Sequence, residues 1–312
     1  GMRAVAWTDT LQGGLLMLGI GGVLVAIIPS PGHMAAITEW IAAAAPDKVA
    51  VPSWSLCVTW ASTLLLIGLS GAVYPHAIQR IYAARSTRTL KRGVMTMAFM
   101  PLLTMFPLFL IGIVGLRELS GLEGIGADQV MPMMLATWAG TSSWLYVAAL
   151  AVMLAVVAAI MSTADSVLLT LSSILAKDVL GKTVLKGASD ARLTRAGKWS
   201  SWAVVAVLVT IAVVPRTTLW GLIELKMELL LQVSPVFVLG LHWPRLTPRA
   251  ALAGMVVGLV VSFALPFSGY TRPLGLHDGT IGWIANVLTC VAVSRATAPG
   301  AEREVADDVA WA

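Results

Sequence analysis

The run AAIMSTADS, from Ala158 to Ser166, lies inside a long apolar block and decides how the rest of the chain is interpreted. Four of its residues are spaced at i, i+3, i+4 and i+7, and a helix would carry them on one face: Ala159, Ser162, Thr163 and Ser166. Hydroxyls in apolar helices often donate to a carbonyl of their own helix or to a neighbouring helix, and packing of this kind accounts for the spacing. The alternative is a site for a small hard cation, which binds oxygen ligands.

The composition around this run is that of a membrane protein. Hydrophobic residues make up 58% and charged residues 12% of the 312 residues, whereas soluble domains carry roughly 25% charged residues. The apolar residues come in blocks of about 20, the length that a helix needs to cross a bilayer core. Asp165 lies within such a block and favours the cation site, because an ionisable group inside a span usually faces a cavity or a partner.

Hydropathy predicts an all-α polytopic membrane protein with eight transmembrane helices. The expected spans are Val5–Ile28, Ser55–Tyr74, Gly93–Leu116, Leu145–Ile174, Trp199–Val214, Leu219–Leu241, Ala250–Leu265 and Gly279–Val293. The proline-rich connection Pro29–Pro52 is expected to be structured or irregular, and Asp128–Trp138 to be a loop with a short helix. Residues 1–295 would form the transmembrane domain. Residues 296–312, which are charged and lack an apolar period, would form a flexible cytoplasmic tail.

The basic residues between the blocks predict the orientation. Apart from Lys226, which lies inside a span, all lysines and arginines except Lys48, Arg117, Arg216 and Arg272 lie in one set of loops. The positive-inside rule makes that side cytoplasmic, with both chain ends inside a bacterial inner membrane. The net charge of +5 is explained in this way without nucleic acid. Because the chain begins with Gly1 almost directly before an apolar segment, we expect a piece of a longer protein.

A second candidate site is the run GLSGAVYPH at Gly68–His76, where two glycines and a proline weaken a helix within a span. Transporters hold substrate at such breaks, although a simple kink or a helix end explains the run equally well. Glu224, Lys226 and Glu228 interrupt the sixth span, either snorkelling to the interface or lining an outer vestibule. Asp9 lies near the cytoplasmic end of the first span, where it can be solvated, and by itself it is weak evidence for a functional site.

Enzyme signatures are absent from the sequence, which contains no Walker A loop, HExxH or GxSxG. The four histidines are scattered without metal-ligand spacing, and the two cysteines form no CxxC or disulfide pattern. We therefore expect a protein that is not an enzyme.

The run AAIMSTADSVLLTLSSILAKDVL at Ala158–Leu180 resembles the signature helix of the sodium:solute symporter family, which includes proline, pantothenate, monocarboxylate and sodium–glucose transporters. Further stretches resemble the family in the expected order: Gly1–Gly13, Gly71–Ser86, Ser234–Gly258 and Gly275–Leu288. The resemblance implies a LeuT-type fold, with two inverted five-helix repeats that hold substrate and ions between them. The first six spans would be core helices 5–10 and the last two peripheral helices. Core helices 1–4 would be missing, so we expect no transport by this chain alone.

The resemblance also implies site residues. Ala159 (through its backbone oxygen), Ser162 and Thr163 match the main sodium-site positions on core helix 8. Asp9 matches an acidic position on core helix 5 that in some members lies on the sodium exit path or at a further sodium site.

For the solute, the resemblance places Ser70, Gly71 and Tyr74 on the part of core helix 6 that lines the substrate cavity. These are not the residue types that bind sugars there, which argues against a sugar. Four charged residues would line the outer vestibule or support the sites indirectly: Asp165, Glu224, Lys226 and Glu228.

The expected function is therefore sodium-coupled symport, in which sodium entry drives uptake of a small polar organic solute. A monocarboxylate, pantothenate or amino-acid-like solute, Na+ and the lipid bilayer are the expected partners, with no nucleic acid, no cofactor besides the coupling ion, and the oligomeric state left open. The alternatives are a transporter-like sensory module, a polytopic membrane enzyme, against which the scattered histidines argue, and a non-functional symporter fragment.

Overall fold

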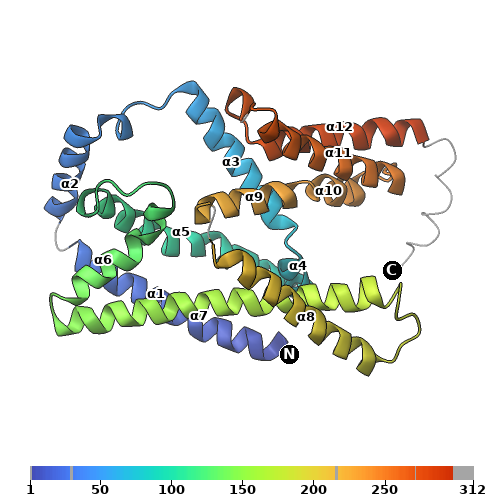
Figure 1. Ribbon diagram of the computed structural model, residues 1–312, viewed down its shortest axis with the longest axis horizontal. Helices are drawn as coiled ribbons and strands as arrows, with labels where there is room; N and C mark the ends of the chain where they lie inside the picture. The colour runs from blue at the N-terminus through green and yellow to red at the C-terminus, as the bar shows by residue number, and fades with distance from the viewer. Residues whose placement is uncertain (1, 29–30, 215–216, 271, 298–312) are drawn as a thin grey trace. The chain divides into compact units, whose positions relative to one another are not determined.

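The computed structural model describes residues 2–28, 31–214, 217–270 and 272–297, and within these ranges every regular element is a helix (Figure 1). The chain forms two compact units. The first comprises Gly1–Ala50 and Gln79–Leu219, and the second comprises Val51–Ile78 and Trp220–Ala312. Residues 298–312 of the expected cytoplasmic tail lie outside the described residues. The all-α prediction is confirmed.

Each of the eight expected spans corresponds to helical structure. The helices are α1 (Met2–Ile27), α3 (Trp54–Ala72), α5 (Thr87–Glu118), α7 (Ser143–Ser173), α8 (Asp190–Ala212), α9 (Leu219–Leu231) followed by α10 (Ser234–His242), α11 (Pro248–Phe267) and α12 (Asp278–Thr297). By length and apolar composition, four helical segments of the described chain are able to cross a membrane: Trp54–Ala72, Thr87–Glu118, Ser143–Leu180 and Pro248–Phe267.

The sixth expected span, Leu219–Leu241, is two helices rather than one. Helix α9 ends at Leu231, and α10 begins at Ser234 with Pro235 in its first turn. Proline has no backbone N–H to donate and its ring clashes with the preceding turn, so a continuous helix is disfavoured here. Hydropathy alone misses this break because both halves are apolar.

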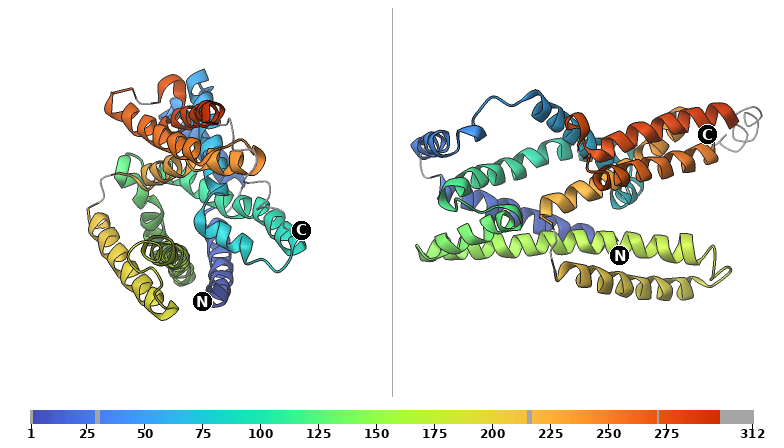
Figure 2. Two further views of the ribbon diagram at one scale, coloured as in Figure 1. Left: turned by 90° about the vertical axis from the view of Figure 1, so that its right-hand side faces the viewer. Right: turned by 45° about the horizontal axis from the view of Figure 1, so that its top comes forward.

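In the first unit, α1 packs against α7, and α2 (Pro31–Ala44), α5 and α6 (Val130–Ala139) complete the core. Helix α2 gives structure to the connection Pro29–Pro52, and α6 is the short helix expected within Asp128–Trp138. Buried apolar side chains from all these helices meet in one cluster: Val23, Ile37, Ile41, Ile111, Val114, Met134, Leu135, Ala149 and Val152. Figure 2 shows α1 and α7 side by side in a second view.

In the second unit, α11 and α12 pack along their length with glycines at the contact. A Cβ atom at Gly254 would lie 2.6 Å from Asn286 Oδ1, and one at Gly258 would lie 2.9 Å from Asn286 Cβ and 3.0 Å from the carbonyl oxygen of Gly282. Small residues at such positions let two helix backbones approach closely, as is common between membrane helices.

Replacing Gly258 by alanine should lower the free energy of unfolding by about 1–3 kcal/mol, because the added methyl group overpacks the α11–α12 contact. The measurement is the thermal unfolding midpoint of the purified full-length protein. Gly93→Ala in α5 is the matched control, because no described atom lies within 4 Å of its Cβ position. Equal midpoints for the two variants would contradict the close approach.

Candidate functional site

The hydroxyl face of α7 lies where the sequence predicts it. Ala159 and Ser162 are half-buried and Thr163 is exposed, while Asp165 is exposed on the neighbouring face. The hydroxyl of Thr163 donates to the carbonyl oxygen of Ala159 at 3.1 Å. A hydroxyl oxygen and a carbonyl oxygen at this separation are able to share a cation, which binds both atoms once the hydroxyl proton turns away.

Helix α1 runs alongside α7 in the opposite direction (Figure 1). The two helices are closest where Gly19 faces Val152, because a Cβ at Gly19 would lie 3.1 Å from Val152 Cγ2. The step from Gly19 back to Asp9 equals the step from Val152 on to Ser162, and both helices rise about 1.5 Å per residue. Asp9 is therefore level with Ser162 along the pair, although its side chain lies outside the described part.

Gln12, one turn further along α1, was not singled out from the sequence. By the same register it lies level with Ala159. Its side-chain oxygen Oε1 is buried and has no hydrogen-bond partner in the described part of the chain. A buried acceptor without a donor is unfavourable unless something else satisfies it, and a cation does so without a proton. The sequence shows that Gln12 lies in a span but not that its oxygen lacks a donor.

The expected helix interruption in the second unit is present. Helix α3 ends at Ala72, and the next helix, α4 (Pro75–Tyr82), begins at Pro75. Proline starts a helix readily but does not continue one, so the chain breaks at Val73 and Tyr74. Gly68 and Gly71, which were expected to weaken the helix, remain helical.

The residues at this break contact α9 through Met227. Ser70 is fully buried, and its hydroxyl donates to the carbonyl oxygen of Met227 at 2.7 Å. The Tyr74 hydroxyl lies 3.7 Å from the Met227 sulfur, and Lys226 Nζ lies 5.4 Å from the centre of the Tyr74 ring. Gly71 is half-buried, with no described atom within 4 Å of its Cβ position. Ser70 therefore joins two helices, while Gly71 and Tyr74 offer surface for a ligand.

Glu224 belongs to a polar cluster at the start of α9. Arg272 Nη2 donates to both of its carboxylate oxygens, at 3.0 and 2.8 Å, and Trp220 Nε1 donates to Oε1 at 2.7 Å. Arg272 was expected only as an external basic residue. The arrangement gives Glu224 a specific partner rather than water alone.

The segment before α12 is strained and held by hydrogen bonds. Arg272 and Leu274 have φ angles of 51° and 58°, in the left-handed region that non-glycine residues seldom adopt. The backbone N–H of Arg272 donates to Asp278 Oδ1 at 3.1 Å, and Thr59 Oγ1 donates to the carbonyl oxygen of Gly275 at 2.8 Å. Such strain persists only where surrounding contacts over-determine the backbone.

His277 follows this segment and is the most buried histidine of the described chain, with 1% of its side chain exposed. Its backbone N–H donates to Ser62 Oγ at 3.0 Å, its Nε2 lies 2.9 Å from Thr63 Oγ1, and its Nδ1 lies 3.9 Å from Glu228 Oε1. In the sequence, this histidine is one of four scattered histidines. Its partners are more than 200 positions away in the sequence, apart from Glu228, so spacing did not reveal them.

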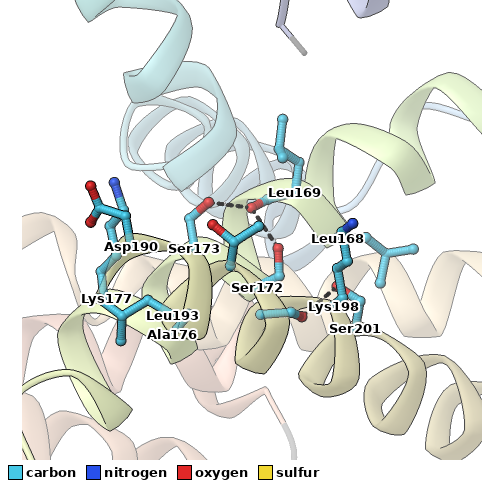
Figure 3. Close-up of a pocket in the computed structure, with 12 residues that line it drawn as sticks. Leu168, Leu169, Ser172, Ser173, Ala176, Lys177, Asp190, Leu193, Lys198 and Ser201 are labelled. Carbon is cyan, nitrogen blue, oxygen red and sulfur yellow. Dashed lines mark hydrogen bonds between the residues drawn. The ribbon is translucent and has the colours of Figure 1, made fainter. Parts of the chain in front are cut away.

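A groove of about 620 Å³ lies between the second half of α7, with η3 (Ile174–Leu180), and α8 (Figure 3). Ser172 and Ser173 line it, but their hydroxyls donate to the carbonyl oxygen of Leu169 at 3.0 and 2.7 Å. The groove begins beyond Ser166 and includes none of the predicted ion ligands. It is therefore separate from the hydroxyl face of α7.

Taken together, apolar helices of spanning length, a hydroxyl–carbonyl pair on α7, and a helix broken within a predicted span are typical of polytopic membrane transport proteins. The sequence profile of the sodium:solute symporter family matches residues 1–258. The chain belongs to the sodium:solute symporter family.

Three relatives illustrate the similarity. The high-affinity proline transporter PutP of Bacillus subtilis (strain 168) is 28% identical over 302 residues, covering 94% of this chain and 61% of the relative. The sodium/glucose cotransporter of Vibrio parahaemolyticus is 25% identical over 309 residues, covering 88% of this chain and 55% of the relative. The sodium/pantothenate symporter of Haemophilus influenzae is 26% identical over 270 residues, covering 83% of this chain and 53% of the relative. The chain thus spans between 53% and 61% of the length of these relatives.

Replacing Ser70 by alanine should lower the free energy of unfolding by about 1 kcal/mol, because it removes a buried hydrogen bond between α3 and α9. Thermal unfolding of the full-length protein measures the effect. The control is Ser268→Ala, which removes an exposed hydroxyl that donates within its own turn to Leu265. If Ser70→Ala unfolded at the same temperature as the control, the Ser70–Met227 bond would not join the helices.

Proposed function

We propose that this protein is a sodium-coupled secondary active symporter that imports a small polar organic solute. The observations that carry the proposal are an oxygen pair on α7 and a buried oxygen on α1. Thr163 Oγ1 and the Ala159 carbonyl lie 3.1 Å apart, and the buried, unpaired Oε1 of Gln12 lies level with Ala159 on the facing helix. Family membership supports the same function, since relatives are named as sodium/proline and sodium/pantothenate symporters.

Sodium is the ion that this oxygen set fits best. Neutral hydroxyl and carbonyl oxygens suit a hard cation of single charge, which does not require several carboxylates. Among the described residues, no three His, Cys, Asp or Glu side chains gather as a metal site, so the proposal depends on neutral ligands. We assign Ala159, Ser162 and Thr163 as ligands, with Asp9 supplying negative charge at the level of Ser162.

The solute is proposed to bind at the break between α3 and α4. Gly71 leaves space beside the helix, and Tyr74 offers an aromatic face and a hydroxyl. Lys226 lies over the Tyr74 ring and brings a positive charge to this region. A carboxylate-bearing solute, such as an amino acid, a monocarboxylate or pantothenate, complements that charge, whereas a neutral sugar does not.

The remaining parts of the proposal concern the membrane. Residues 1–295 would be the transmembrane domain of a transporter without enzymatic activity, in a bacterial cytoplasmic membrane. The loops that carry most of the lysines and arginines would face the cytoplasm, as the positive-inside rule requires. Residues 296–312 would form a cytoplasmic tail.

Replacing both Ser162 and Thr163 by alanine should raise the sodium concentration that half-saturates the full-length protein by at least about tenfold. The reason is that one lost ligand interaction of about 1.4 kcal/mol corresponds to tenfold in affinity. Equilibrium binding of radiolabelled sodium measures the change. The control is Ser172→Ala with Ser173→Ala, two hydroxyls of the same helix outside the proposed site. Unchanged sodium affinity in the first variant would contradict the ligand assignment.

Replacing Gln12 by methionine should weaken sodium binding without lowering stability in sodium-free buffer. Methionine keeps the length of the side chain but removes an oxygen that has no donor, so no hydrogen bond to Oε1 is lost. Thermal unfolding with and without sodium separates the two effects. A variant that is stabilised by sodium as strongly as the native protein would show that Gln12 does not contact the ion.

A further inference from the structure

The surroundings of His277 determine which of its ring nitrogens carries a proton. Nε2 lies 2.9 Å from Thr63 Oγ1, and the single hydroxyl proton of Thr63 is donated to the carbonyl oxygen of Thr59 at 2.8 Å. With the Thr63 proton on the Thr59 carbonyl oxygen, Nε2 is the donor to Thr63 Oγ1. In this tautomer a neutral His277 carries its lone pair on Nδ1.

That lone pair faces a carboxylate. Nδ1 lies 3.9 Å from Glu228 Oε1, which is too long for a hydrogen bond but short for two groups that are both acceptors. The imidazole is 1% exposed and the Glu228 side chain 19% exposed, so water screens the pair poorly. One added proton, on either group, turns two facing acceptors into a donor and an acceptor.

We propose that His277 and Glu228 form a proton-binding site, in which one proton lies between Nδ1 of the imidazole and the Glu228 carboxylate. The site takes up a proton from water and releases it to water, and no other bond is made or broken. Proton binding would draw Nδ1 and Oε1 together from 3.9 Å toward the roughly 2.8 Å of a charge-assisted hydrogen bond.

The other charged groups near the pair have partners of their own. Asp278, next to His277, accepts from the backbone N–H of Arg272, and Glu224 accepts from the Arg272 guanidinium. The backbone N–H of Gly279 faces the Glu228 carboxylate, at the amino end of α12. Helix α3 contributes only the neutral Ser62 and Thr63 and carries no charged residue.

Burial lowers the pKa of His277 from its ordinary value and the nearby Arg272 charge lowers it further, while the Glu224 and Asp278 charges act in the opposite direction. The imidazole alone is therefore a poor proton acceptor, and the facing Glu228 carboxylate is what favours proton uptake as the pH falls. Gly279 also allows the approach of the acid, because a Cβ atom there would lie 2.6 Å from Glu228 Cγ.

The pair is connected to the proposed solute region by one residue. Met227 precedes Glu228 on α9, and its carbonyl oxygen accepts the Ser70 hydroxyl while its sulfur contacts Tyr74. Movement of Glu228 toward His277 therefore acts on the α3–α9 contact at the helix break. This connection to transport depends on the proposed function, whereas proton binding itself does not.

The test is a pH titration of the purified full-length protein, with 15N-labelled histidine followed by NMR. The signal of His277 is identified by its loss in His277→Gln. We expect Nε2 to remain protonated throughout and Nδ1 to gain its proton as the pH falls. In Glu228→Gln the midpoint should fall by about one to three pH units, because an opposite charge within about 4–6 Å is removed. In Glu228→Asp the His277 midpoint should lie between that of the native protein and that of Glu228→Gln.

The controls are Glu39→Gln, an exposed acid of α2, and His242→Gln, an exposed histidine of α10. Neither should move the His277 midpoint. The proposal is overturned if Glu228→Gln titrates like the native protein, or if Nδ1 of His277 stays unprotonated over the whole range while the infrared band of a protonated acid shows no dependence on Glu228.

These outcomes are separable from those that concern symport. Sodium-dependent uptake without a shared proton would remove this inference alone. A shared proton in a protein that shows no sodium-dependent uptake would leave the pair standing and remove the proposed function.

Discussion

A polar group inside a membrane-spanning helix has no water to bind, so it must find its partner within the protein or in a ligand. Most hydroxyls of the described helices satisfy this requirement locally, as when Thr170 donates to the carbonyl oxygen of Ser166. Others tie one helix to another, as Ser70 does with Met227 and Ser62 with Thr280. Among the described residues, two buried side-chain oxygens have no hydrogen-bond partner: Gln12 Oε1 and Gln232 Oε1.

Gln12 and Glu228 carry the two proposed binding sites, which differ in chemistry. Gln12 presents a buried neutral oxygen without a donor on α1, the helix that packs against α7. Glu228 presents a carboxylate 3.9 Å from Nδ1 of a buried imidazole. The first arrangement suits a cation that binds several oxygens at once, and the second suits a proton. Gln12 lies in the first compact unit, together with the proposed sodium ligands of α7. Glu228 lies in the second compact unit, together with the proposed solute site at the α3–α4 break.

Much of the fold was predictable, because a helix that crosses the bilayer needs an apolar stretch of matching length and hydropathy detects such stretches. The boundaries of α1, α7, α11 and α12 lie within a few residues of the expected spans. The break between α9 and α10 was missed because it follows from a single proline, Pro235, inside a continuous apolar stretch.

The candidate sites were less accessible from sequence, for a physical reason. The hydroxyl face of α7 was visible because its members are neighbours on one helix. The site at His277 was not predictable, because it depends on Thr63 and Ser62. These residues contact His277 only because α3 packs against the segment before α12. For Gln12, the decisive fact is a missing donor, and no spacing pattern records that.

The central claim is that sodium entry drives solute uptake, and the most direct test uses sealed vesicles that carry the full-length protein. Uptake of labelled proline, pantothenate, monocarboxylates and a neutral sugar would be measured with and without an inward sodium gradient. Accumulation of a carboxylate-bearing solute that disappears when the gradient is removed is the predicted result. Accumulation that is indifferent to sodium would contradict the account, and Ser162 and Thr163 would then be packing residues of an apolar helix.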